Sequence, residues 1–145
     1  IFLQDMIHNA SDGNPFRIYM IDVNDFKQVN DKFGHIVGDR ALQLVGDALH
    51  NVSDKHHGFC ARYGGDEFVL IISEEAEVQN EIQNEVDILR KRCSDLIPQL
   101  SVCTGSAECR SGAVTATQLI AQADEKLYVQ KEIFHGRRKP TEDTK

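Results

Sequence analysis

The sequence predicts an α+β sandwich of the ferredoxin-like type, with one layer of helices on a mostly antiparallel sheet. Strand-like runs and amphipathic helical runs follow one another in the order helix, strand, helix, hairpin, helix, strand, helix. Two strand–helix–strand units around a central hairpin are typical of this fold. The chain has 145 residues, of which 41% are hydrophobic, so it can bury one core without disulfides or a structural metal.

The first half of the chain predicts two helices and a strand. Residues 1–10 place their apolar side chains on one side of a helix, and residues 16–23 (FRIYMIDV) are rich in strand-forming side chains. Residues 24–39 are a polar stretch rich in Asn, Asp and Gly. The apolar residues of 38–50 repeat at helical spacing, which predicts the next helix there.

The second half predicts a hairpin, a helix, a strand and a final helix. Residues 59–63 and 68–72 are short strand-like runs on either side of a Gly-Gly-Asp-Glu turn, which indicates a hairpin. Apolar residues three and four apart predict a long helix over 78–96, and a strand is expected over 98–107. The final helix starts at a capping box that Thr115 opens.

Charge and composition narrow the classes of function. A net charge of −7 argues against nucleic acid as a partner. No apolar run reaches the roughly 18 residues of a membrane helix, and there is no signal peptide. The 4 cysteines lack zinc-site spacing and suit a reducing cytoplasm. We expect a cytoplasmic domain without membrane contact, cut from a longer protein because it starts at Ile1, and the membrane anchoring of that parent stays open.

Carboxylates stand at the ends of two predicted strands. Asp22 ends the first strand, and Asp66 and Glu67 occupy the tip of the hairpin. One interpretation is structural, with Asp22 capping a turn and the hairpin acids solvated. The other places the hairpin beside the first strand, so that Asp22 and Asp66 jointly hold Mg²⁺, which prefers one or two carboxylates plus substrate phosphates.

Four blocks of sequence carry a resemblance to one family. They are residues 22–31 (DVNDFKQVND), 33–39 (FGHIVGD), 62–68 (RYGGDEF) and 123–131 (ADEKLYVQK). In this order and at these spacings they resemble the motifs of the GGDEF family, the diguanylate cyclases of bacterial second-messenger signalling. The resemblance implies a palm-like fold related to nucleotidyl cyclase catalytic domains. This domain would cover residues 1–139, without the family's extreme N-terminal segment, and a disordered tail is expected over 140–145.

The activity implied by this resemblance is the condensation of two GTP molecules into cyclic di-GMP with release of two pyrophosphates. The implied cofactor is Mg²⁺, with Mn²⁺ as an alternative. Turnover would need a homodimer in which each subunit holds one GTP, and a sensory or dimerising domain would lie outside this chain. The alternative is a catalytically inactive GGDEF domain that binds GTP or cyclic di-GMP as a sensor or scaffold.

The resemblance also implies roles for individual residues. Asp22, the backbone carbonyl of Val23 and Asp66 would hold the metal. Asp66 or Glu67 would accept the proton of the attacking 3′-hydroxyl, and Lys27 would stabilise charge on the transferring phosphate. The implied substrate contacts are Phe26, Asn30, His35, Asp39, Gly64, Gly65, Lys131 and Arg137.

Asn30 and Asp39 are the implied guanine readers. A carboxylate accepts hydrogen bonds from guanine N1–H and N2–H₂, while an amide both donates and accepts. Each residue also has a structural interpretation, since Asn30 suits a turn and Asp39 suits a helix N-cap. His35 lies in the same segment and is either a substrate contact or a structural histidine.

Three departures from the family pattern qualify the resemblance. Asn24 stands where a second Asp is usual, which keeps a ligand oxygen but loses a charge. Residues 55–58 (KHHG) stand where the product-binding Arg-x-x-Asp motif is expected, so we expect feedback inhibition through that site to be lost. The family expects Gly-Arg three and four residues after Lys131, whereas Gly136 and Arg137 come two residues later.

Overall fold

The computed structural model describes residues 2–11, 13–73, 78–92 and 100–136. Its centre is a four-stranded antiparallel sheet with the strand order β2-β3-β1-β4. The strands are β1 (Phe16–Val23), β2 (Phe59–Gly64), β3 (Glu67–Ile72) and β4 (Val102–Cys109). The helices are α1 (Phe2–Asn9), α2 (Phe26–Phe33), α3 (His35–Lys55), α4 (Gln79–Arg92) and α5 (Ala116–Gly136).

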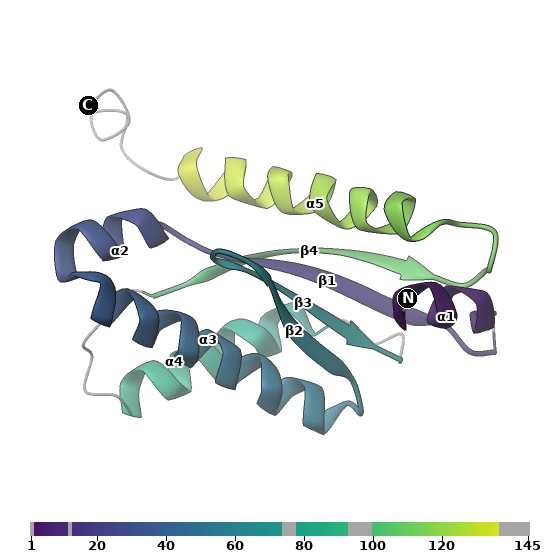
Figure 1. The fold of residues 1–145 in the computed structure, drawn as a ribbon, viewed down its shortest axis with the longest axis horizontal. Coiled ribbons are helices and arrows are strands. Elements are labelled where there is room, and N and C mark those ends of the chain that lie inside the picture. Colours follow the sequence, from purple (N-terminus) through teal and green to yellow (C-terminus); the bar gives the residue numbers. More distant parts are fainter. Residues whose placement is uncertain (1, 12, 74–77, 93–99, 137–145) are drawn as a thin grey trace.

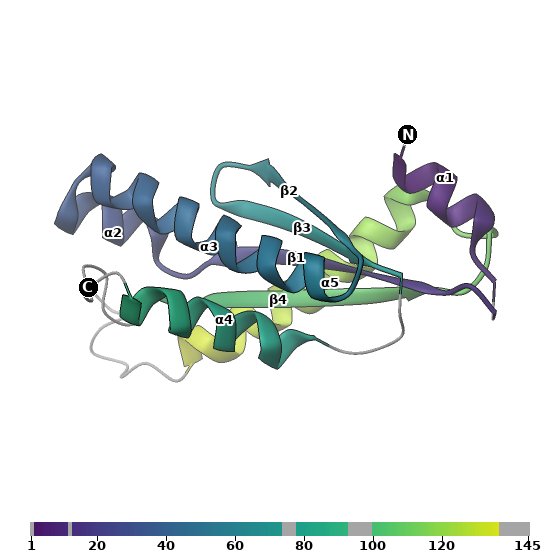
Figure 2. The same ribbon diagram turned by 90° about the horizontal axis from the view of Figure 1, so that it is seen from below.

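Helices cover both faces of the sheet. Figure 1 and Figure 2 show α3 and α4 on one face, with α5 on the opposite face and α1 near the start of β1. The predicted fold class is confirmed, but the expected single helical layer is wrong. The reason lies in β1, which is buried at every position except Arg17 and therefore has no solvent-facing side.

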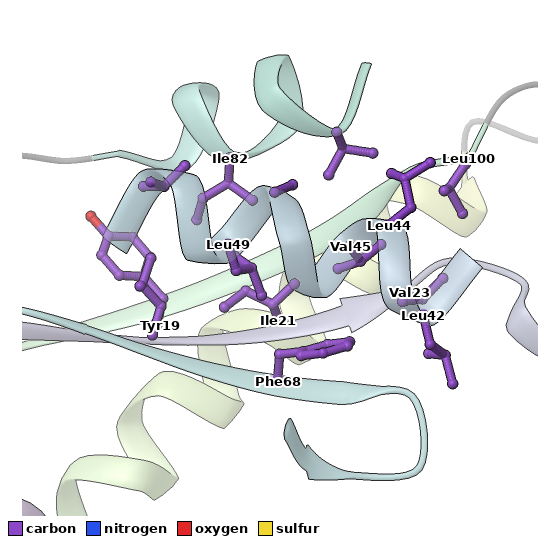
Figure 3. Packing of buried hydrophobic residues seen from close by; sticks show 14 of the residues in the cluster. Tyr19, Ile21, Val23, Leu42, Leu44, Val45, Leu49, Phe68, Ile82 and Leu100 are labelled. Carbon is purple, nitrogen blue, oxygen red and sulfur yellow. The ribbon is translucent and has the colours of Figure 1, made fainter. Parts of the chain in front are cut away.

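Side chains alternate along β1 between two hydrophobic clusters. Tyr19, Ile21 and Val23 point toward α3 and α4, where they meet the apolar faces of both helices (Figure 3). Ile18 and Met20 point the other way and pack with the inner face of α5. The central strand is thereby fixed from both sides, and so is the carboxyl end from which Asp22 projects.

The polar stretch after β1 is helical, which the sequence analysis did not predict. It folds into α2, and α3 already begins at His35 and continues to Lys55, longer at both ends than the predicted 38–50. The signal was hidden in a polar composition, because Phe26 and Val29 lie three residues apart and pack together against the core.

The remaining predicted element boundaries agree in part with the structure. The capping box is confirmed, since the Gln118 N–H donates to Thr115 Oγ1 at 3.1 Å and the Thr115 N–H donates to Gln118 Oε1 at 3.0 Å. The strand expected over 98–107 begins later and ends at Cys109. The end of the helix expected over 78–96 lies outside the described residues, as does the tail.

Gly105 sets how closely α5 approaches the sheet. A Cβ atom at this position would lie 2.2 Å from both the Ala123 carbonyl oxygen and the Leu127 nitrogen, so only glycine lets the helix backbone rest on β4. This contact aligns α5 with the sheet and brings its second half over the end of β1. Within the part of the chain that the structure describes, no helix has the length and apolar character to cross a bilayer.

Candidate active site

The hairpin between β2 and β3 lies beside the carboxyl end of β1. In the ladder of β1 and β3, Asp22 stands opposite Glu67. The Val23 N–H then donates to the Asp66 carbonyl oxygen at 3.2 Å. The two acidic segments, far apart in sequence, therefore meet at one point of the sheet, as the interpretation with the hairpin beside the first strand requires.

The surroundings of Asp22 disfavour its charged form. It is only 7% exposed, and its Oδ1 atom is buried without a hydrogen-bond partner. Burial raises the pKa of Asp22 to about 6, Lys131 opposes that shift, and the neighbouring Asp66 carboxylate adds to it. A buried carboxylate with an unpaired oxygen and a second carboxylate beside it is poised to accept a cation.

Lys131 supplies positive charge at the same point. Its ammonium group, on the second half of α5, forms an ion pair and hydrogen bond with Asp22 Oδ2. The two residues are 109 positions apart, and the close packing of α5 on Gly105 brings them together. The family resemblance implies a phosphate contact for Lys131, and the structure places it directly on the candidate metal ligand.

The donor set fits a hard cation held partly by substrate. Within the described ranges, no three His, Cys, Asp or Glu side chains gather as a complete metal site. Asp22, Asp66 and the Val23 backbone instead offer oxygen ligands only, and one of these oxygens has no protein partner. Magnesium is commonly bound by one or two carboxylates together with phosphate oxygens, so these residues fit Mg²⁺.

The turn of the hairpin leaves room for a ligand. A Cβ atom at either Gly64 or Gly65 would meet nothing within 4 Å, and Gly65 has a φ of +44° that favours glycine. Arg62 fixes the turn, since its Nε–H donates to the Gly65 carbonyl oxygen at 2.8 Å. Glycine at both positions keeps the backbone accessible beside Asp66.

The implied guanine readers lie at the corner between α2 and α3. Asn30 Oδ1 is buried without a partner, and a Cβ atom at Gly38 would lie 1.7 Å from it, so the two helices touch where the amide sits. Asp39 follows Gly38 directly and is exposed. The structure thus brings Asn30 and Asp39 to one corner, while His35 at the start of α3 is exposed.

The other predicted substrate contacts lie in ordinary surroundings or outside the described residues. Lys27 is exposed in the first turn of α2, and Phe26 is half-buried against the core. Arg137 lies outside the described residues. Because α5 is helical through Gly136, the residue one turn after Lys131 is His135, at the position where the family pattern expects Arg. In the sequence, the i, i+4 spacing from Lys131 already indicates that His135 lies next to Lys131 on the same face of the helix.

The end of α3 is occupied by internal ion pairs. Glu81 of α4 accepts from His56 Nε2 at 2.9 Å and lies 3.4 Å from Lys55 Nζ. Although burial opposes the shift, His56 and Lys55 hold the pKa of Glu81 below its ordinary value. The segment where a product-binding motif was expected is therefore tied to α4.

The sheet, its helical cover and the acidic hairpin at the end of β1 define a palm-like α+β domain. A sequence profile of the family described as "Diguanylate cyclase, GGDEF domain" matches residues 2–137. The chain belongs to the GGDEF family, as the four motif blocks indicated.

Relatives within the family carry different names. The chain is 34% identical to "Diguanylate cyclase DosC" of Escherichia coli (strain K12) over 142 residues, which cover 90% of this chain and 29% of that protein. It is 31% identical to "Cyclic di-GMP phosphodiesterase PdeR" of the same strain over 141 residues, covering 92% of this chain and 21% of that protein. The chain thus spans less than a third of these relatives.

Solved structures show the same fold. The coiled coil and GGDEF domain of DgcB from Caulobacter crescentus, in complex with c-di-GMP, matches with a TM-score of 0.70 and 26% identity over 94% of this chain and 74% of that one. The active GGEEF domain of a diguanylate cyclase from Vibrio cholerae matches with a TM-score of 0.63 and 27% identity over 83% of this chain and 78% of that one.

Proposed function

We propose that this domain is a diguanylate cyclase, which joins two GTP molecules into cyclic di-GMP and releases two pyrophosphates. The observation that carries the proposal is the buried Asp22, with one unpaired oxygen, Asp66 beside it and Lys131 on its other oxygen. Oxygen ligands for a divalent cation and a lysine at the same point match the charge of a nucleoside triphosphate.

Asp22, the Val23 carbonyl and Asp66 are the residues that would hold Mg²⁺ or Mn²⁺. An ion held there would neutralise charge on the phosphates and polarise the attacking hydroxyl. Lys131, which pairs with Asp22 in this structure, would be free to pair with phosphate oxygens where Asp22 held the ion.

The chain's own groups carry the rest of the reaction. The 3′-oxygen of one GTP attacks the α-phosphorus of the other, and the bond from that phosphorus to the pyrophosphate oxygen breaks. Asp66 or Glu67 accepts the 3′ proton, and Lys27 stabilises charge on the transferring phosphate. Gly64 and Gly65 let backbone N–H groups approach phosphate oxygens, where a β-carbon would obstruct them.

Guanine selection is assigned to the corner between α2 and α3. The Asn30 amide oxygen and the Asp39 carboxylate together offer the acceptors that the guanine N1–H and N2–H₂ groups require. Adenine has no such pair of donors on that edge, so ATP would leave these groups unpaired and bind poorly.

Two copies of the domain are needed because each new bond joins the nucleotide of one subunit to that of the other. The proposed working unit is a homodimer with facing sites, and it operates in the cytoplasm. A sensory or dimerising domain of the parent protein controls when two copies meet.

The direct test is incubation with GTP and Mg²⁺, followed by chromatography for cyclic di-GMP and pyrophosphate. Asp66→Ala is expected to reduce turnover by at least about 100-fold without changing the circular dichroism spectrum. Asp47→Ala, which removes an exposed acid of α3, is the matched control and should retain activity. Equal turnover of ATP and GTP would contradict the guanine assignment, and unchanged product from Asp66→Ala would contradict the metal assignment.

A second candidate function is a sensor that binds GTP or cyclic di-GMP without turnover. The feature that favours it is Asn24, an amide where the family usually has a second acid. Calorimetry distinguishes the two, since the sensor would bind GTP tightly while no product accumulates at high protein concentration.

A further inference from the structure

A hollow of about 320 Å³ lies along the outer edge of β4, between α4 and α5. Because β4 is the last strand of the sheet, its outer edge is not paired with another described strand. We call this space the edge hollow, and its lining includes Asn24, Gln83, Val102, Thr104, Gln130 and Phe134.

The backbone of β4 presents a donor and an acceptor to the edge hollow. Just before β4, the Ser101 carbonyl oxygen points inward and accepts from the Asn24 N–H at 2.9 Å, whereas the Val102 N–H points outward and donates to Gln83 Oε1 at 3.1 Å. Residues of an antiparallel edge strand alternate between these two directions. The N–H and C=O groups of Thr104 therefore face outward as well.

Two buried side-chain oxygens of the lining have no partner. Asn24 is 7% exposed, and its Nδ2 donates to Ser101 Oγ at 2.8 Å, which leaves Oδ1 without a hydrogen bond. Thr104 is 4% exposed, and its Oγ1 is likewise unpaired. Buried polar atoms of this kind are costly unless something binds them, so the hollow is a candidate ligand site.

The lining determines the class of ligand. Every lining residue that the structure describes is uncharged, and the polar ones carry amide, hydroxyl or thiol groups. Ile133 and Phe134 of α5 add an apolar wall. Such a surface suits a neutral, flat molecule that carries an N–H donor next to an acceptor atom and has apolar faces.

We propose that the edge hollow binds a neutral purine ring, with the ring pairing to the outward backbone groups of Thr104 and to the amide and hydroxyl groups of the lining. Addition of a peptide strand is disfavoured, because the Gln83 side chain already occupies the Val102 N–H. The hollow borders the proposed metal site, because its lining includes Asn24, next to Val23, and Cys103, opposite Asp22. The guanine readers proposed above, Asn30 and Asp39, lie instead at the corner of α2 and α3, so the purine site proposed here differs from the guanine site.

The test is titration of the ¹⁵N-labelled domain with adenosine and, separately, guanosine, which lack phosphate and require no metal. Saturable chemical-shift changes are expected for the backbone amides of 101–104 and the Gln83 side chain, unchanged by EDTA. Thr104→Val, which replaces the hydroxyl with a methyl group of similar size, should weaken binding about 5-fold. Guanosine is also titrated into Asn30→Ala, so that its signal does not arise from the proposed GTP site.

A matched pair of variants on α4 tests whether the ligand occupies the edge hollow. Asn80→Trp places a bulky ring at the rim of the hollow and should abolish the shifts, whereas Asn84→Trp, on an exposed residue outside the lining, should leave them intact. The inference is overturned if no saturable shifts appear, if they map only to the α2–α3 corner, or if Asn80→Trp binds like the unsubstituted domain. None of these readouts depends on turnover, so failure here is separable from failure of the cyclase proposal.

Discussion

Asp22 combines three properties that a purely structural carboxylate would not need. It is buried, one of its oxygens is unpaired, and a second acid lies beside it. Lys131 offsets part of the cost by pairing with the other oxygen. Burial destabilises the charged form of this carboxylate and nearby positive charge stabilises it. Such an arrangement is expected where a cation is bound.

The pH dependence of stability follows from the pKa of Asp22. The folded domain holds this proton until pH rises to about 6, whereas the unfolded chain loses it near 3.8, so the unfolding free energy falls between these values. Asp22→Asn has no proton to lose, and metal-free Asp22→Asn should therefore gain up to about 3 kcal/mol over the unsubstituted domain as pH rises from 4 to 7. Urea unfolding in EDTA across this range measures the difference.

Parallel pH profiles for the two proteins would show that the Asp22 carboxylate is well solvated. The control is Asp124→Asn, an exposed acid of α5 whose profile should follow that of the unsubstituted domain.

At the residue scale, the sequence indicated which residues are candidates for the site, but not which of them contact one another. Motif spacing alone pointed to Asp22 and Asp66, because strand ends and hairpin tips are recognisable from local patterns. The pairing of Lys131 with Asp22 was not predictable, since it depends on how a distant helix seats on the sheet. That seating depends in turn on Gly105, whose role only the packed backbone reveals.

At the scale of elements, local patterns were sufficient where hydrophobic spacing is strong. The hairpin, β1 and the capping box at Thr115 were predicted because each has its own turn or cap residues. The helix α2 was missed because its polar composition dominated over two half-buried apolar residues, Phe26 and Val29. The second helical layer was missed because the coverage of both faces of β1 is decided by tertiary packing.

The seating of α5 gives the second prediction. Gly105→Ala places a Cβ against the backbone of Ala123 and Leu127, which cannot move independently of the helix. We expect a loss of about 1–3 kcal/mol in the unfolding free energy and a weaker affinity for GTP, because Lys131 is displaced with α5. Chemical denaturation and calorimetry with GTP measure the two effects.

Gly46→Ala is the matched control, since its Cβ would meet Phe68 at an ordinary 3.6 Å and lies within α3. It should be neutral or stabilise the domain by up to about 1 kcal/mol. A Gly105→Ala variant as stable as Gly46→Ala would mean that α5 does not rest on β4.

The junction of α3 and α4 gives the third prediction. Lys55 and His56 pair with Glu81, and position 58 has no room for a carboxylate, because a Cβ on Gly58 would lie 2.5 Å from the Ile71 carbonyl oxygen. Added cyclic di-GMP should therefore leave the initial rate of pyrophosphate release unchanged.

Glu81→Ala sharpens this test, because it releases Lys55 and His56 but supplies no carboxylate, so inhibition should remain absent. Potent inhibition of the unsubstituted domain by its product would contradict the assignment, and loss of that inhibition in Glu81→Ala would place the binding site at this junction.

At the scale of the whole molecule, the proposed reaction requires two domains to face each other, and the chain covers only 29% of its relative DosC. An isolated domain should therefore act only when two copies meet by diffusion, and its specific activity should rise with protein concentration. Fusing a parallel dimeric coiled coil before α1 should raise activity at low concentration by about 100-fold, since tethering replaces diffusion with a high effective concentration. The same fusion carrying Asp66→Ala separates assembly from chemistry, because it should dimerise and remain inactive.

The two-site mechanism would be wrong if a domain shown to be monomeric by light scattering had a specific activity that did not vary with protein concentration. One copy would then be sufficient for the reaction.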